Sequence, residues 1–424
     1  MRTVKTSGLS FSADETRILF TSDASGILNA YEVSLNDHTQ RQLTHSVTDN
    51  IHAVSYFPDD ERILISKDHG NRENSALCVL EPDGKEISLT PVGEVQSIFH
   101  RWSFDGLSFY VSTNERDERV YDLYKIDART FERELLYGAT EKYYCCAISK
   151  DEQKILFLRS TRKTDSDIFL YDVPTSEMKC LTPHEGDMLN CLPVFDREET
   201  RIYYVSDSDS DFRHVRRLAL ASGKIQCIER ASADVVATCF APDYGRRLTL
   251  FNDCATTLRV MIIHDEASGS VARLPGYSQQ SITSAIFSRS GRYLAFYAEG
   301  DRSPGDIHVY DFEQQSVTQL TRSLAPEIDP EDLVESEIVS FRSFDGLEIP
   351  CLLWRPRETR RAPALVWVHG GPGGRMAKGY KGRIQYFANH GYVVLGLNYR
   401  GRFRANESRF EMPQMFTPAA NCSG

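Results

Sequence analysis

The chain has 424 residues, a formal net charge of −11 and 41% hydrophobic residues. The length exceeds that of one ordinary domain and predicts two, while the hydrophobic fraction is typical of a globular protein. The negative charge argues against nucleic acid or an anionic membrane surface as the main partner.

The sequence carries no sign of a membrane segment, an export signal or a cross-linked framework. It has no run of about 18 apolar residues, and its start, MRTVKTSGLS, lacks an apolar core, so we expect neither a membrane span nor a secretory signal. The ten cysteines are scattered and none forms CxxC. This pattern predicts reduced thiols in a cytoplasmic protein, without a zinc site, and no motif calls for a cofactor.

One unit repeats seven times through the first three quarters of the chain. Each copy contains a short polar turn followed by an apolar run, and the copies start 45 to 47 residues apart, at Phe11, Phe57, Trp102, Ile148, Phe195, Phe240 and Phe287. Two further apolar runs, together with the apolar residues before the turn, give each unit four short strands. Such units are typical of propeller blades, so residues 8–321 are predicted to form a seven-bladed β-propeller. Helical repeats are disfavoured because no segment keeps a 3.6-residue period.

Recurring acidic residues in these units predict turns rather than catalysis. The same place is occupied in four units by Asp14, Asp59, Asp105 and Asp151. Aspartate at a repeated turn bonds its own backbone. The run Asp207–Asp211 resembles the start of a calcium loop, but Phe212 replaces the required glycine and Leu218 the final acidic ligand. We interpret this run as a solvated hairpin loop and expect no metal site.

The pattern changes after residue 321. Residues 322–340 contain two prolines and six acidic residues, which predicts a linker with at most one helical turn near residues 330–334. Residues 341–401 then predict a hairpin turning at Asp345-Gly346, a third strand, a glycine-rich loop, a short helix that stops at Gly391, and another buried strand. This order is how α/β-hydrolase domains begin, so an incomplete domain of that class is expected after the propeller.

The third strand, ALVWV, runs directly into His369, Gly370 and Gly371. A strand that ends in HGG is how many α/β-hydrolases build half of an oxyanion hole. Backbone N–H groups held in such a loop stabilise the negative oxygen formed during acyl transfer. A phosphate-binding loop is excluded, because Tyr380 stands where that motif requires lysine.

Several ordered motifs in this region resemble the prolyl oligopeptidase family of serine peptidases, and most closely its acylaminoacyl-peptidase and dipeptidyl-aminopeptidase-like branch. The motifs are Phe344-Asp345-Gly346, Ile349-Pro350, His369-Gly370-Gly371-Pro372, Gly391-Tyr392 and Asn398-Tyr399-Arg400-Gly401. The repeats lack the GH…WD signature and look like the TolB-like blades of this family. The resemblance implies hydrolysis of short peptides by a Ser-Asp-His triad, with the propeller screening access to a site between the domains. It also implies that Gly371 is the oxyanion donor, that Gly370 shapes the turn, and that His369 supports the site rather than acting as the triad base.

The catalytic machinery that the resemblance implies is missing from the sequence. No GxSxG occurs in the 424 residues, and residues 402–424 form an atypical tail without a strand or helix period. No catalytic residue is therefore assigned. The pattern favours a C-terminally truncated or frame-shifted product, with a natural short form or one half of a split enzyme as alternatives.

Two classes of function remain open at this stage. The first is a serine-peptidase-family protein that is inactive alone and acts on short peptides only if another chain completes it. The second is a non-catalytic propeller that serves as a binding or interaction module. A sheet that stops after four strands leaves an edge unpaired, so self-association or a complementing C-terminal hydrolase fragment is expected, with no nucleic acid or membrane partner.

Overall fold

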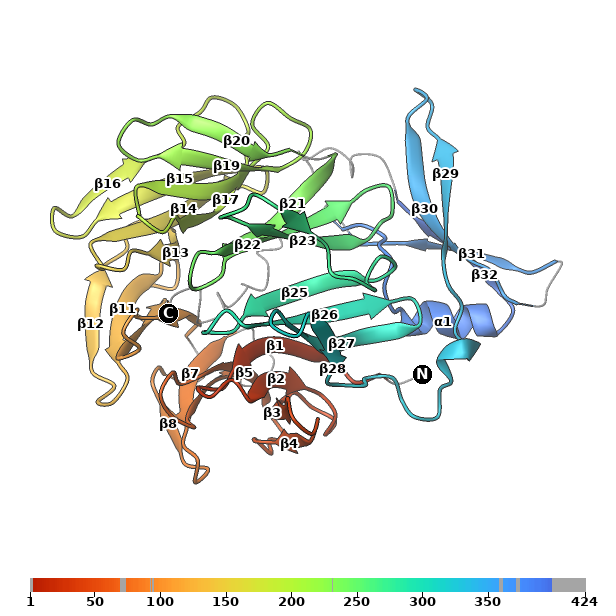
Figure 1. Ribbon diagram of the computed structural model, residues 1–424, viewed down its shortest axis with the longest axis horizontal. Helices are drawn as coiled ribbons and strands as arrows, with labels where there is room; N and C mark the ends of the chain where they lie inside the picture. Colours follow the sequence, from red (N-terminus) through yellow and green to blue (C-terminus); the bar gives the residue numbers. More distant parts are fainter. Residues whose placement is uncertain are drawn as a thin grey trace.

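The computed structural model describes residues 3–68, 74–91, 93, 95–230, 232–357, 361–370 and 374–398. Within these residues, seven four-stranded antiparallel sheets follow one another, and an eighth sheet with an α-helix comes after them (Figure 1). In each of the seven, hydrogen-bonded neighbours are also neighbours in the chain, so every sheet is a meander. The turn of each repeated sequence unit joins the first strand of a sheet to the second.

The strand bounds follow the repeat. The first three sheets comprise β1 (Thr6–Phe11), β2 (Arg17–Ser22), β3 (Asn29–Ser34), β4 (Gln40–Gln42); β5 (Asn50–Tyr56), β6 (Ile63–Asp68), β7 (Ser75–Leu80), β8 (Glu86–Ser88); and β9 (Ser97–Trp102), β10 (Ser108–Thr113), β11 (Asp122–Asp127), β12 (Arg133–Tyr137). The fourth and fifth comprise β13 (Tyr144–Ile148), β14 (Lys154–Arg162), β15 (Asp165–Asp172), β16 (Glu177–Cys180); and β17 (Asn190–Phe195), β18 (Arg201–Ser206), β19 (His214–Ala219), β20 (Ile225–Glu229). The sixth and seventh comprise β21 (Ala233–Phe240), β22 (Arg246–Asp253), β23 (Arg259–Asp265), β24 (Val271–Ala272); and β25 (Ser281–Phe287), β26 (Tyr293–Gly300), β27 (Ser303–Asp311), β28 (Ser316–Gln319).

The recurring aspartates act in turns, as predicted, in three of four units. Asp14 Oδ1 accepts hydrogen bonds from the Ser12 hydroxyl and the Thr16 N–H at 2.6 and 3.1 Å. Asp105 and Asp151 make the equivalent pair of contacts in the third and fourth sheets. In the second sheet the neighbouring Asp60 accepts the N–H of Arg62 instead. The prediction for Asp59 itself is therefore not met. The turn has the same length in all four units and Asp59 lies at the equivalent place, but Phe57 stands where the other three units have a serine hydroxyl that donates to the aspartate.

Apolar clusters lie between successive sheets and a further cluster joins the seventh sheet to the first, so the sheets are arranged in a ring, which fits a β-propeller. The cluster that joins the ends of the ring contains Phe11, Ile18 and Phe20 of the first sheet and Ala295, Tyr297 and Ile307 of the seventh. The Val4 N–H also donates to Ser323 O at 3.2 Å, and the Tyr297 hydroxyl donates to Gly8 O at 3.0 Å. The N-terminal segment thus holds the seventh sheet against the first.

The fourth strand of each sheet lies at the periphery and is mostly exposed (Figure 1). These strands have only 2 to 5 residues, whereas the second strands are largely buried. Short edge strands give other chains little to pair with. The outer rim of the ring is therefore protected against edge-to-edge association.

The eighth sheet contains β29 (Glu337–Arg342), β30 (Glu348–Trp354), β31 (Ala364–Val368) and β32 (Val393–Leu397), in the spatial order β29-β30-β32-β31. The first two strands form the predicted hairpin, and Gly346 has a φ of +84° in its turn. β31 and β32 run parallel and are connected through α1 (Gly382–Asn389), so this part is a β-α-β crossover. A 3-10 turn at Pro330–Asp332 precedes the sheet.

The helix α1 ends at Gly391, as predicted. The Gly391 N–H bonds to Ala388 O at 3.1 Å, and the Tyr392 N–H bonds to Phe387 O at 3.1 Å. Gly391 has a φ of +86°, and the rings of Phe387 and Tyr392 lie 5.8 Å apart. This is a Schellman motif with its apolar contact, in which the left-handed residue is glycine because a Cβ would strain it.

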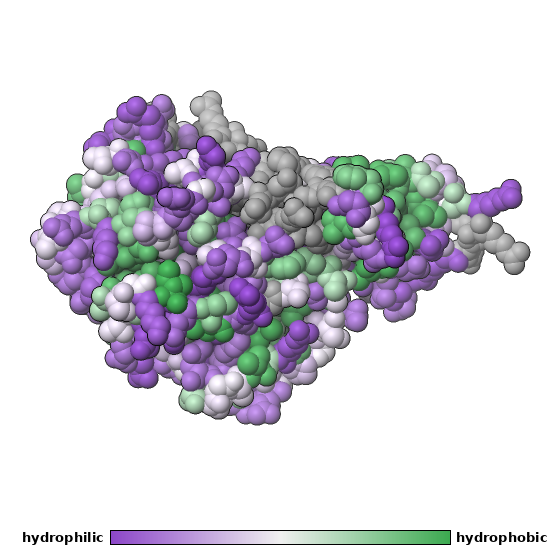
Figure 2. Space-filling view, turned by 90° about the horizontal axis from the view of Figure 1, so that it is seen from above, coloured by the Kyte–Doolittle hydropathy of each residue, from purple (hydrophilic) through white to green (hydrophobic). Residues whose placement is uncertain are grey.

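The two faces of the eighth sheet differ in burial. Residues that pack on one another between the sheet and α1 are Val334, Leu352, Trp354, Met376, Ile384, Ala388 and Val394. On β31, Val366 and Val368 point the other way and are 61% and 57% exposed, and Phe344 in the hairpin is 92% exposed. Figure 2 shows apolar residues gathered over this end of the molecule. One face of the sheet is thus covered and the other presents apolar side chains.

Candidate functional site

The candidate site lies where the parallel strands β31 and β32 end. In sheets of this kind, ligands bind outside the carboxyl ends of parallel strands. The strand β31 forms because ALVWV is a run of β-branched and apolar residues, and it pairs with β32 from Ala364 to Val368. The loops that follow both strands therefore leave from the same edge of the sheet, and the predicted residues His369 and Gly370 come directly after β31.

The loop after β31 folds back on itself. His369 Nδ1 donates to Gly370 O at 2.9 Å, since the carbonyl oxygen can only accept. A Cβ placed on Gly374 would lie 2.5 Å from the same carbonyl oxygen, so only glycine fits there. Gly370 is exposed. Gly371, the residue predicted to donate to an oxyanion, lies outside the described residues.

Asn398 fixes the far end of this loop, a role that sequence reasoning did not assign. Its Oδ1 accepts the Met376 N–H at 2.7 Å, and its Nδ2 donates to Pro350 O at 2.9 Å and Met376 O at 3.3 Å. The side chain is almost completely buried. Asn398 thus holds the loop against β30 through hydrogen bonds in both directions.

The same loop contacts the ring. Arg375 Nη2 donates to Asn252 Oδ1 at 3.0 Å, at the end of β22. The Lys378 N–H donates to Thr257 O at 3.3 Å, and Lys378 O accepts from the Ser281 hydroxyl at 3.2 Å. The sixth and seventh sheets of the ring therefore set the position of the loop together with the eighth sheet.

Charged residues are half-buried where the loop and the ring meet. A Cβ on Gly379 would lie 2.7 Å from Glu299 Oε1, so the carboxylate packs directly on the glycine backbone. Burial raises the pKa of Glu299, and the nearby charges of Lys381 and Arg259 oppose the shift. Burial likewise lowers the pKa of Lys381, with Glu299 opposing. Desolvation thus disfavours the charged forms of Glu299 and Lys381, and the attraction between the two opposite charges partly offsets that cost.

Gln385 connects the ring, the linker and α1. Its Nε2 donates to Asp301 O at 2.9 Å and Val334 O at 2.8 Å, and its Oε1 accepts the Val334 N–H at 2.8 Å. The Asp301 carboxylate also accepts from the N–H and hydroxyl of Ser336. Residues 333–336 of the predicted linker are therefore anchored at this junction.

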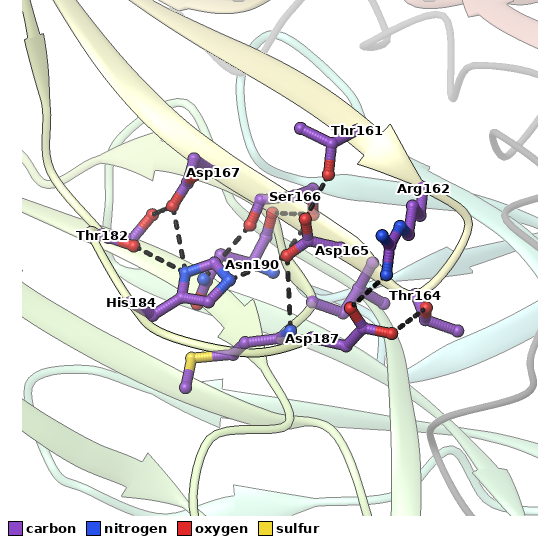
Figure 3. A network of polar contacts seen from close by, with 12 residues as sticks. Thr161, Arg162, Thr164, Asp165, Ser166, Asp167, Thr182, His184, Asp187 and Asn190 are labelled. Carbon is purple, nitrogen blue, oxygen red and sulfur yellow. Dashed lines mark hydrogen bonds and ion pairs between the residues drawn. The ribbon is translucent and has the colours of Figure 1, made fainter.

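A second polar cluster lies in the fourth sheet, around His184 (Figure 3). His184 Nε2 lies 2.8 Å from Asp165 Oδ1, and Nδ1 lies 2.9 Å from Thr182 O and 3.1 Å from Asp167 Oδ1. All three partners are acceptors, so both ring nitrogens must carry a proton. Burial opposes the charge, but hydrogen bonds to Thr182 O and Asp165 outweigh it and raise the pKa of His184.

The cluster has the residue types of a catalytic triad but not its geometry. The Ser166 hydroxyl donates to Asn190 O at 2.7 Å and is not bonded to His184 in the described residues. Thr182 Oγ1 accepts the Ile168 N–H and donates to Asp167. The same three-residue pattern recurs in the first sheet with Asn29, Ala30 and Thr44, and in the seventh with Asp306, Ile307 and Thr321. We therefore interpret the cluster as a structural motif that holds the segment after the fourth strand of a sheet against its third strand. In the fourth sheet His184 adds further hydrogen bonds to this motif.

Other kinds of site have no counterpart in the described part of the chain. No three His, Cys, Asp or Glu side chains there are grouped to bind a metal ion. No helix among the described residues is long and apolar enough to cross a membrane.

The chain is similar to known peptidases in sequence and in fold. It is 23% identical over 397 residues to dipeptidyl aminopeptidase BIII of Pseudoxanthomonas mexicana, a match that covers 89% of this chain and 56% of that protein. This relative supports the resemblance to the prolyl oligopeptidase family that the sequence motifs indicated. No family model matches the sequence.

Solved structures of peptidases share the fold. A prolyl endopeptidase structure superposes with a TM-score of 0.75 at 14% identity, over 95% of this chain and 62% of that one. A puromycin-hydrolysing peptidase of Mycobacterium tuberculosis superposes with a TM-score of 0.76 at 15% identity, over 93% and 66%. The chain spans a little over half of the curated relative and less than two thirds of these two structures.

Proposed function

We propose that this chain is a peptide-binding protein of the prolyl oligopeptidase family. In this proposal, residues 8–321 form a seven-bladed β-propeller, residues 341–401 are the opening part of an α/β-hydrolase domain, and residues 322–340 link the two. The observation that carries the proposal is the loop after β31, which is held between the eighth sheet by Asn398 and the ring by Arg375. A peptide entering between ring and sheet would meet His369 and Gly370 there.

We propose further that the 424 residues do not hydrolyse peptides by themselves. Acyl transfer in this family's manner needs a nucleophile, a base that activates it and an acid that orients the base. The sequence has no GxSxG, and within the described residues no serine is bonded to a histidine that is also bonded to a carboxylate. The loop would then provide oxyanion stabilisation without a nucleophile to use it.

Labelling with a serine-directed fluorophosphonate tests this part of the proposal. The purified chain is expected to remain unlabelled under conditions that label dipeptidyl aminopeptidase BIII to completion. Heat-denatured samples of both proteins control for non-specific reaction. One equivalent of label on the native chain would contradict the proposal and would place a reactive serine among these residues.

The exposed face of the eighth sheet supports a proposal about partners. In the described residues β31 has a strand on one side only, and Val366 and Val368 lie exposed beside that open edge. An open edge next to an apolar face readily recruits another strand. We propose that a second polypeptide with hydrolase-domain strands completes the sheet here, and that without it the chain self-associates through this edge.

Limited proteolysis and light scattering test the partner proposal. In a monomeric preparation, cleavage within residues 341–398 is expected well before cleavage within the ring. The double variant V366K/V368K is expected to reduce self-association, while Val271→Lys, at an exposed valine on the rim, leaves it unchanged. Resistance of residues 341–398 equal to that of the ring, in a monomer, would contradict the proposal.

A further inference from the structure

Arg375 places a guanidinium group at the junction between the loop after β31 and the ring. Its Nη2 donates to Asn252 Oδ1 at 3.0 Å. Arg259, at the start of β23, donates to the same oxygen through Nε at 3.2 Å and to Thr283 O through Nη1 at 3.2 Å. Two guanidinium groups therefore converge on one neutral amide oxygen.

The positive charge of Arg375 is not neutralised by a direct ion pair. Across the part of the chain that the structure describes, no carboxylate oxygen lies within 4.0 Å of its nitrogens. The two carboxylates whose charges act on Arg375 are those of Asp234 and Asp253, and both have other partners. Asp234 pairs with Arg213. Asp253 accepts hydrogen bonds from a backbone N–H and a threonine hydroxyl of its own turn. Burial and the neighbouring Arg259 accordingly lower the pKa of Arg375 to about 10.

A half-buried cation such as Arg375, with no carboxylate partner among the described residues, is costly unless a ligand supplies the anion. Among the described residues, Asn252 takes one of the five N–H donors of Arg375 and no other acceptor is bonded to the rest of its planar fork. The fork matches a carboxylate, to which it donates two parallel hydrogen bonds. Arg375 directly follows Gly374, whose backbone packs on Gly370 O at the end of β31. The cation thus lies beside the loop to which the proposed function assigns the peptide.

We propose that Arg375 binds a carboxylate of the peptide ligand, with Asn252 orienting the guanidinium and Arg259 strengthening the positive potential. This inference rests on the proposed peptide binding and adds the chemical class of the ligand. The carboxylate is either the free C-terminus of a short peptide or the side chain of an aspartate or glutamate in it. Binding requires no bond to form or break, since Arg375 acts by hydrogen bonds and charge alone.

Calorimetric titration of the full chain with matched peptides tests the inference. The ligands are acetyl-Ala-Ala with a free carboxylate, acetyl-Ala-Ala-amide, and acetyl-Ala-Asp-amide, whose only carboxylate is a side chain. We expect at least one of the two acids to bind about tenfold or more tighter than the neutral amide, which corresponds to about 1.4 kcal/mol. Tight binding of the first acid alone identifies a terminal carboxylate, and equally tight binding of both acids shows that either source is accepted.

Variants then assign the preference to Arg375. R375Q is expected to bind acid and amide equally, and R375K to keep part of the preference because it retains the charge but loses the fork. The matched control R133Q, at a half-buried arginine in the third sheet that is paired with Glu115, is expected to keep the full ratio. Thermal unfolding identifies any variant that fails to fold, in which case R375K alone carries the comparison.

Three results would overturn the inference. Equal binding of acid and amide to the wild type would exclude a carboxylate site and leave the proposed peptide binding standing. Binding of none of the three peptides would reject the proposed function as well. A preference that survives unchanged in R375Q would show that Arg375 serves only as a tie between the loop and Asn252.

Discussion

Replacing His184 should loosen the fourth sheet, and the effect should shrink as pH rises. Both ring nitrogens face acceptors, and only 8% of the side chain is exposed, so the native contacts require the imidazolium form. The folded-state pKa of His184 is raised above its ordinary value. Its contribution is therefore complete below an unfolded-state pKa of about 6.5 and is lost as pH rises through the folded-state pKa.

The size of the effect depends on the bonds that are lost. His184→Leu removes two charge-assisted hydrogen bonds and leaves Asp165 and Thr182 O without this donor. A hydrogen bond to a charged group contributes about 1.5–3 kcal/mol, and an abandoned buried acceptor costs about 1–3 kcal/mol. Because Asp165 is partly exposed and keeps its contacts with Thr161 and Met188, we expect a total near the lower end, about 2–3 kcal/mol at pH 5.5. The loss should be clearly smaller at pH 8.5.

Hydrogen exchange measured by mass spectrometry is the appropriate assay, because a chain of 424 residues need not unfold in two states. The Ser166 N–H donates to Met188 O at 3.0 Å, and the Met188 N–H donates to Asp165 Oδ1 at 3.4 Å. Exchange of both amides, corrected for the intrinsic rate at each pH, should accelerate in His184→Leu more at pH 5.5 than at pH 8.5. Amides of the first sheet provide the internal control.

His308 offers a contrast of opposite sign. Its Nδ1 lies 2.8 Å from the Tyr277 hydroxyl, and burial lowers the pKa of His308 to about 4. Its neutral form contributes stability above about pH 6.5, and that contribution falls by about 1 kcal/mol between pH 7.5 and pH 5.5. The destabilisation caused by His308→Asn should therefore grow with rising pH. Equal effects of His184→Leu at both pH values, or the same slope for both histidines, would refute the assignment of charge to His184.

Four further substitutions test the packing around the candidate site. Gly396→Ala should destabilise the eighth sheet by about 1–3 kcal/mol in urea unfolding, because the new Cβ would lie 2.7 Å from a buried methionine side chain. Gln385→Leu should expose residues 341–398 to protease earlier than in the wild type. The substitution leaves three backbone groups without their partner, at a cost of about 1–3 kcal/mol each. Unchanged cleavage would show that Gln385 does not hold the junction. Gly379→Ala should have a similar effect on cleavage because its Cβ would meet the Glu299 carboxylate, and the shorter side chain of Glu299→Ala should partly reverse it.

The repeated fold could be predicted from sequence because its signals are local. The turn residues and apolar runs of each unit specify four strands without reference to the rest of the chain, and Gly391 ends α1 through contacts with its own last turn. The closure of the ring could not be predicted in this way. It depends on Val4 and Gly8 meeting residues about 290 to 320 positions away, and no pattern within one unit specifies that contact.

The candidate site was predicted only as a strand followed by HGG. The motif located His369 and Gly370, because the order of strand and glycines is itself the signal. Asn398, Arg375 and Gln385 were missed as site residues, since each acts through a partner far away in sequence. Their residue types are also common on protein surfaces, so only the fold shows that their side chains are buried or bonded across the junction of ring and sheet.

The contacts of the loop after β31 imply that ring and sheet determine its shape together. Asn398 holds Met376 from the side of the sheet, while Asn252 holds the adjacent Arg375 from the side of the ring. A rotation of the ring relative to the sheet would either break one of these hydrogen bonds or move the loop as well. Because Gly370 O packs against Gly374 in the same loop, such a movement would also displace the residues that follow β31. A ligand that contacts both Arg375 and this loop, as proposed above, would therefore favour one relative placement of ring and sheet.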